Sequence, residues 1–262
     1  MSPSFYLLLA LLGAGSGIVS GLLGIGGAII IVPVLLYLPE WLGFDTIEIK
    51  RAAAIAVAQV VAASLTGALM HGRHGHVHRR LLIYVSVAST IGALAGGVIS
   101  AYAPSDALLI VAALLATTAA ALMLLPRAAD AAEHNDHAPF NPALALGSGA
   151  AIGLLIGLIG IGSFLMVPAM IFLLRQRTRV AMATVLAVAF PTALAGLIGK
   201  FATNQVPLWE SVAIVIGAIP GAQIGSIISA RLQPRLLRAL YAALVIIIAS
   251  GLWYDVFNTR AP

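Results

Sequence analysis

The sequence predicts an all-α transmembrane protein made of two inverted repeats, each a glycine-tipped helical hairpin (re-entrant or broken) followed by three transmembrane helices. Three observations lead to this fold class. The composition is too apolar for water, the charged residues divide the chain into eight apolar stretches, and the two halves of the chain repeat each other. The positions of the basic residues then indicate how the stretches cross a membrane.

The composition excludes an ordinary soluble protein. Of the 262 residues, 61% are hydrophobic and 9% are charged, whereas soluble chains carry about 25% charged residues. Because there is no cysteine, a disulfide framework, a thiolate metal site and a cysteine nucleophile are also excluded. The lipid bilayer is therefore the expected partner, and the net charge of +5 is interpreted by its position across the membrane, with no nucleic acid implied.

Two of the eight apolar stretches have an unusual length. Six are about as long as one membrane span, which needs about 20 residues. The first and the fifth, with 34 and 32 residues, are long for one helix and short for two full crossings with a turn, and both contain glycine clusters near their middle. The eight stretches are residues 5–38, 52–70, 81–102, 107–125, 143–174, 180–199, 208–230 and 239–254.

The two halves carry the same two landmarks in the same order, which indicates an internal duplication. The first landmark is a glycine cluster followed by Val-Pro, and the second is a Gly-Ala segment that recurs 129 residues later. The first occurs at 21–33 and 157–168, and the second at 92–101 and 221–230. We therefore divide the chain into a first repeat at 1–126, a polar linker at 127–142 and a second repeat at 143–262.

The basic residues favour a hairpin for each long stretch. If both stretches crossed once, the two membrane faces would hold six and eight of the 14 Lys and Arg residues; with two hairpins the split is ten to four, as the positive-inside rule expects. The ten predicted to face the cytoplasm are Arg73, Arg79, Arg80, Arg127, Arg175, Arg177, Arg179, Arg231, Arg235 and Arg238. The four predicted to face outside are Lys50, Arg51, Lys200 and Arg260.

This topology has a consequence for function. Each half makes an odd number of crossings, so the second half enters the membrane inverted, with both termini outside and the linker in the cytoplasm. Inverted repeats with discontinuous helices are typical of secondary transporters, which bind their substrate near the membrane midplane.

The two glycine tips are the candidate substrate site. A helix rises about 1.5 Å per residue, which places the first tip deep in the bilayer. The free N–H groups and positive dipole end of the helix after each tip would bind an anion without a charged side chain. The tip residues are Gly24, Gly26, Gly27, Gly160, Gly162 and Ser163. For the other glycines, Gly13, Gly17, Gly21, Gly92 and Gly96, close helix packing is the preferred explanation.

With these motifs the chain resembles the TauE/SafE family of sulfite and sulfonate transporters. The resemblance rests on the paired glycine motifs with Val-Pro, on Met182–Leu186 after a basic loop, and on Pro220–Gly225, and it covers about residues 10–250. It implies a membrane carrier for small sulfur-containing anions such as sulfite, sulfoacetate or other organosulfonates.

Polar side chains within the spans are further candidates, because such groups are costly in a membrane and commonly functional. Gln59 and Gln223 are placed to donate an amide to a sulfonate oxygen, and the alternative for each is an interhelical hydrogen bond. The resemblance favours Thr184 as a substrate contact. The common alternative for a helical hydroxyl is a bond to its own helix, which we expect for Ser64, Thr66, Ser89, Thr90 and Thr192.

Two groups at the ends of spans have less specific interpretations. The histidines of residues 71–78 have no carboxylate or cysteine beside them, so we expect no metal site there. Arg73 and Lys200 either attract anions to the two mouths of the transporter or anchor helix ends, which is the more common role.

The function expected from the sequence is secondary transport. No protease, hydrolase or P-loop motif occurs, so we expect neither an enzyme nor a cofactor. Every acidic residue lies in or beside a loop, so we hypothesise potential-driven export by alternating access across a bacterial-type inner membrane, with coupling to sodium still open. The alternatives are an anion channel, a carrier of another oxyanion or carboxylate, and a structural or sensor protein. Expected partners are a small anionic substrate, lipid and, as an open alternative, a second copy in a homodimer.

Overall fold

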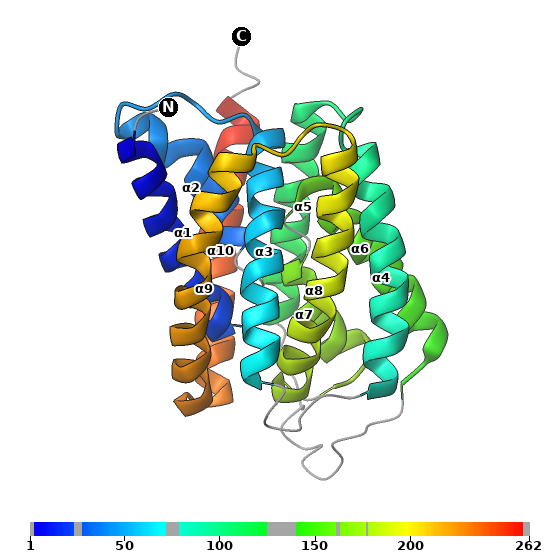
Figure 1. Cartoon of the computed structure of the whole chain (residues 1–262). Coiled ribbons are helices and arrows are strands. Elements are labelled where there is room, and N and C mark those ends of the chain that lie inside the picture. Colours follow the sequence, from blue (N-terminus) through cyan, green and yellow to red (C-terminus); the bar gives the residue numbers. More distant parts are fainter. Residues whose placement is uncertain are drawn as a thin grey trace.

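The computed structural model describes residues 3–23, 28–71, 79–124, 140–160, 163–176 and 178–258, which form a bundle of helices (Figure 1). The helices are α1 (Pro3–Leu23), α2 (Ala28–Trp41), α3 (Ile49–His71), α4 (Arg79–Ile99), α5 (Ser105–Leu124), α6 (Pro142–Ile159), α7 (Ser163–Pro168), the π-helical turn η3 (Ala169–Leu173), α8 (Thr178–Ala202), α9 (Leu208–Arg231) and α10 (Pro234–Asn258). No strand occurs in these ranges, and seven of their helices are long and apolar enough to cross a membrane. The all-helical membrane class is confirmed.

Both long apolar stretches are divided into two helical pieces. The first becomes α1 and α2, with residues 24–27 outside the described part of the chain, and the second becomes α6 and α7, with residues 161–162 outside it. Phe5 at the start of α1 and Phe44 after the end of α2 have ring centroids 5.3 Å apart. The first pair of helices therefore begins and ends at the same end of the bundle, as Figure 1 also shows.

The second broken stretch has its boundaries set by particular residues. Pro142 is the first residue of α6, where a missing N–H is tolerated, and the Asn141 side chain accepts a bond from Ala143 N at 2.9 Å. Gly160 ends the helix with φ 79°, and its N–H donates to Ile156 O at 2.8 Å. Pro168 has no N–H to continue α7, and the backbone after it widens into η3.

The helices are arranged around a central pair (Figure 1). In that view α3 and α8 lie at the centre, with α1 and α9 on one side and α4 and α6 on the other. The helices α5 and α10 pack against each other behind them. Because α3 contacts both α8 and α9, it is the most buried of the candidate spans, and its polar side chains lie within protein instead of facing lipid.

Glycines bring α1 and α9 into backbone contact. A Cβ atom at Gly21 would lie 2.2 Å from Ala222 O, and one at Gly217 would lie 1.8 Å from Ala10 O, so neither position admits a methyl group. The glycines in this contact are Gly13, Gly17 and Gly21 on α1 and Gly217, Gly221 and Gly225 on α9. Membrane helices commonly use small residues in this way, and the packing explanation for the α1 glycines is confirmed.

The same kind of contact joins α4 to α6. A Cβ atom at Gly96 would lie 2.1 Å from Leu154 O, and one at Gly153 would lie 2.1 Å from Ser89 O. Gly92 and Gly157 lie in the same seam, so packing also explains the α4 glycines. The first helix of each half, α1 or α6, therefore packs on the fourth helix of the other half, α9 or α4.

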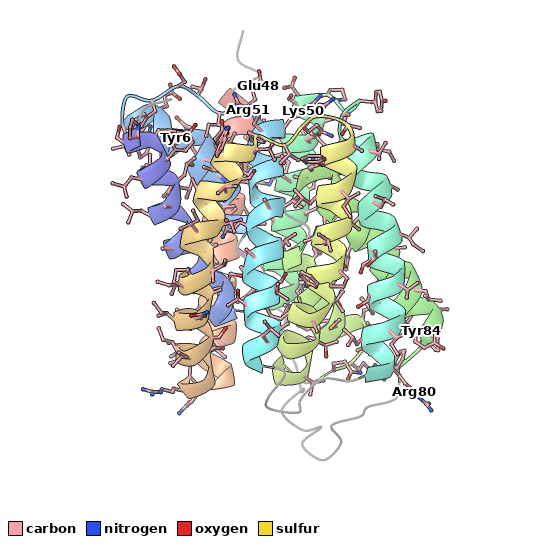
Figure 2. The ribbon with its side chains drawn as sticks, viewed as in Figure 1. Tyr6, Glu48, Lys50, Arg51, Arg80 and Tyr84 are labelled. Carbon is pink, nitrogen blue, oxygen red and sulfur yellow. The ribbon has the colours of Figure 1, made fainter. Side chains whose placement is uncertain are left out.

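The charged residues separate to the two ends of the bundle (Figure 2). Lys50 and Arg51 lie at one end and Arg80 at the other, which agrees with the predicted assignment of these residues to opposite faces. At the first end, Arg51 forms an ion pair with Glu210 at 2.8 Å, which connects the start of α3 to the start of α9.

Candidate substrate site

Gln59 forms the centre of a buried polar cluster. It lies in the middle of α3 with no exposed surface, and its Nε2 donates to Ser16 Oγ of α1 at 2.7 Å. Ser16 in turn donates to Leu12 O at 2.6 Å. The Gln59 Oε1 atom has no partner among the described residues, although a buried polar atom is nearly always paired. Interhelical bonding, one of the two predicted roles, therefore uses only one end of this amide.

The buried hydroxyl groups fall into two classes. Those that bond a carbonyl of their own helix are Ser16, Ser64, Ser89 and Thr192, and the half-buried Thr66 does the same. Ser89 and Thr192 are also bonded to each other at 2.6 Å. Those that have no partner in the described residues are Ser20, Thr184, Ser211 and Ser226. Self-bonding is the usual way in which a helical hydroxyl is satisfied, so the second class needs another explanation.

Ser20 and Ser226 lie at the last turn of α1. Ser20 is one helical turn after Ser16 on the same face of α1, and directly precedes Gly21. The backbone N of Ser226 on α9 lies 2.8 Å from where a Cβ of Gly21 would be. Two unpaired hydroxyls therefore flank the last turn of α1, which leads into residues 24–27.

The structure places only part of the predicted tips. Gly24, Gly26, Gly27 and Gly162 lie outside the described residues, and Ser163 is described as the first residue of α7 without its side chain. Gly160 allows the end of α6 to approach α3 closely, because a Cβ atom at this position would lie 2.7 Å from Ala53 O of α3. The end of α6 therefore contacts the first turns of the most buried helix.

Gln223 is not part of this cluster. Both of its predicted roles, a substrate contact and an interhelical hydrogen bond, place it inside the bundle, whereas its side chain is exposed on α9. The reason is helical geometry. The glycine face of α9 that packs on α1 includes Gly221 and Gly225, and Gln223 lies two residues, or about 200°, from each of them.

Lys200 also differs from its expected setting. A helix-end lysine normally extends toward the membrane surface, whereas this side chain has no exposed surface and donates to Ser100 Oγ at 2.7 Å and to Leu158 O at 3.3 Å.

The side chains of the histidine segment 71–78 lie outside the described part, and in the rest of the described chain no three His, Asp or Glu residues form a metal-binding group.

Sequence reasoning missed Ser16, Ser20 and Ser226. The available signal was the repeated Ser-Gly pair at 16–17 and 20–21, which places two hydroxyls beside two packing glycines. It could not be separated from ordinary small-residue packing without knowing which side of α1 faces α3.

Comparisons with known proteins agree on the class of protein. The sulfite exporter TauE/SafE family matches residues 9–252. A probable membrane transporter protein of Xylella fastidiosa (strain Temecula1) is 31% identical over 92% of this chain and 93% of its own length. The probable membrane transporter protein YunE of Bacillus subtilis is 24% identical over 95% of this chain and 98% of its own length. No solved structure gave a significant match.

Proposed function

The chain belongs to the sulfite exporter TauE/SafE family, whose members are membrane transporters and not enzymes, and we propose that it exports small sulfur-containing oxyanions. The proposed substrates are sulfite, sulfoacetate and other organosulfonates, and the proposed location is a bacterial-type inner membrane. The observation that carries this proposal is a set of buried neutral polar atoms from four different helices that have no partner among the described residues. They are the hydroxyls of Ser20, Thr184 and Ser226 and the Oε1 atom of Gln59.

Unpaired buried groups have a cost that a ligand would remove. Each unsatisfied donor or acceptor destabilises the fold by about 1–3 kcal/mol. The hydroxyl groups of Ser20 and Thr184 are donors suited to sulfite or sulfonate oxygens. Rotation of the Gln59 amide by 180° would direct its NH2 group to the position of the unpaired oxygen. Ser16 would then release Leu12 O and donate its single hydroxyl hydrogen to the Gln59 oxygen. The described part of the spans thus offers neutral donors for an anion.

Charge placement supports an anion instead of a cation. In the described residues the buried carboxylate is Glu210, and its partner Arg51 neutralises it at one end of the bundle. α2 begins at Ala28, directly after the first tip, and a helix of 14 residues directs free N–H groups and a partial positive charge toward that tip. We propose that Gly24, Gly26 and Gly27 bind the anion together with these side chains, and that Gly160, Gly162 and Ser163 form the second half of the site.

The proposed mechanism is alternating access between two inverted repeats. The reciprocal packing of α1 on α9 and of α4 on α6 supports this, because it is the pattern that two copies of one unit, related by a two-fold axis, would produce. The helix pair α1 and α9 and the helix pair α4 and α6 would each move as a rigid body, because the glycines between them bring the two backbones into contact.

Flux measurements on the full chain in proteoliposomes test the proposal. Sulfite, sulfoacetate, taurine, isethionate and sulfate are offered in turn, and we expect saturable flux of the first two in excess of sulfate. A rate that rises linearly with concentration and does not saturate would indicate a channel, and the absence of flux for every sulfur anion would contradict the proposal.

Two threonines on α8 provide a matched pair of variants. Thr184→Val removes an unpaired hydroxyl and is expected to lower flux at least about tenfold without loss of stability. Thr192→Val removes a hydroxyl that bonds Ser89 and Val188 O, so it should lower stability while flux per folded protein is retained. Equal flux in the Thr184→Val variant and the unmodified protein would exclude Thr184 from the site.

A further inference from the structure

The buried ammonium group of Lys200 lies where three helices end. Lys200 belongs to the last turn of α8, Ser100 directly follows α4, and Leu158 is the penultimate residue of α6. The lysine Nζ bonds the Ser100 hydroxyl and the Leu158 carbonyl, while Ser100 donates to Gln205 Oε1 at 2.8 Å. The neutral groups around this lysine are therefore already paired.

The charge of Lys200 is not compensated within the described residues. No carboxylate there forms an ion pair with it, and the buried Glu210 is paired with Arg51. A second lysine, Lys50, donates to Ala101 O at 3.1 Å, which places its ammonium beside the same α4 terminus. Two ammonium groups thus converge on residues 100–101, and neither has an acidic partner in the part of the chain that the structure describes.

Helix capping accounts for only part of this arrangement. The Leu158 carbonyl is one of the last four of α6 and needs a donor, which Lys200 supplies. A neutral side chain would do the same without burying a charge, which is costly unless the charge is paired. An ammonium has three N–H donors, and two of those of Lys200 have partners among the described residues.

We propose that Lys200, assisted by Lys50, forms a second anion site at this end of the bundle. It binds the transported oxyanion between the solution on the Lys50 side and the central site. The inference deepens the proposed function and depends on it, because the ligand is the same small oxyanion. The anion supplies the counter-charge that the described residues do not provide, and the third N–H of Lys200 is its donor.

The test is equilibrium dialysis of radiolabelled sulfite against the purified full chain, with flux measured on the same preparations. We expect two bound anions per chain. Lys200→Gln should abolish one of them and leave the central affinity intact, while Gln59→Leu should affect the other. Lys50→Gln is the second variant in case Lys200→Gln does not fold, and it should weaken the outer site by about tenfold, as expected for a lost charged contact. Arg80→Gln, at the opposite end, is the charge-matched control and should retain both sites.

The outcomes separate this inference from the proposed function. If Lys200→Gln and Lys50→Gln both retain two sites of unchanged affinity, the lysines are structural caps and the inference is wrong, while flux of sulfite would still support the transporter. If chloride occupies the outer site and sulfite does not displace it, the assignment to the transported oxyanion is wrong. If sulfite neither binds nor is transported, the proposed function is wrong, and the second anion site is wrong with it.

Discussion

Gln59 and Ser16 join α3 to α1 through a single hydrogen bond of 2.7 Å, and the other end of the Gln59 amide is left without a partner in the described residues. A structural tie between two helices would be expected to use both ends of the amide. The amide of Gln59 has one unpaired end, and its partner Ser16 lies one helical turn before the unpaired hydroxyl of Ser20. This arrangement indicates a place where another molecule completes the bonding.

Replacing Gln59 should separate stability from transport. Gln59→Leu keeps the side-chain volume and removes the unpaired oxygen, and Ser16 keeps its bond to Leu12 O. We expect the free energy of unfolding to stay level or to rise by about 1 kcal/mol, while sulfite flux falls at least about tenfold. Thermal unfolding and proteoliposome flux measure the two effects.

The control for this substitution lies on the same helix. Ser64 is equally buried, but its hydroxyl bonds Val60 O at 2.5 Å. Ser64→Ala should leave flux within about twofold of the unmodified protein. Parallel losses in Gln59→Leu and Ser64→Ala would show that α3 responds to any substitution, and would remove the support for Gln59 as a ligand.

The contact between α4 and α6 predicts that two Gly→Ala substitutions in α6 have opposite effects on stability. Gly153→Ala places a methyl group 2.1 Å from Ser89 O, so the helices must separate, with a loss of about 1–3 kcal/mol. Gly147→Ala meets no atom within 4 Å and should stabilise α6 by about 0.5–1 kcal/mol. Unfolding temperatures in detergent test both, and a stable Gly153→Ala variant would contradict the close packing.

Membrane potential should drive the flux. An anion that leaves the negative side of a membrane gains about 2.3 kcal/mol per charge per 100 mV. We expect sulfite efflux from proteoliposomes at a fixed concentration gradient to accelerate when an inside-negative potassium diffusion potential is imposed. Rates that do not change with the potential would exclude uncoupled movement of charge and favour coupling to a cation.

The predicted topology can be tested by labelling single introduced cysteines, because the chain has no native cysteine. A cysteine introduced at Ser2 should react with an impermeant thiol reagent added outside intact cells, and one introduced at Asn135 in the linker should react only after the cytoplasmic side is exposed. Labelling of the Ser2 position from the cytoplasmic side alone would reverse the orientation and, with it, the side assigned to Lys50 and Lys200.

The sequence by itself determined the class of this protein and the breaks in its long helices. Low charge requires a bilayer, and apolar length sets the number of spans. The glycine spacing on α1 and α4 was sufficient to predict close packing, because residues four apart share a helix face regardless of the partner. The order of the motifs was sufficient to indicate the family.

The tertiary structure alone decided which polar side chains meet. Gln59 and Gln223 look alike in sequence, since both stand among apolar residues that surround the helix on all sides, and such a helix carries no signal for the face that meets protein instead of lipid. Packing of the α9 glycines on α1 directs Gln223 outward, while α3 is enclosed and keeps Gln59 inside. The burial of Lys200 and the unpaired hydroxyls of Ser20 and Ser226 arise in the same way, because a missing partner depends on the neighbouring helices and not on the residue itself.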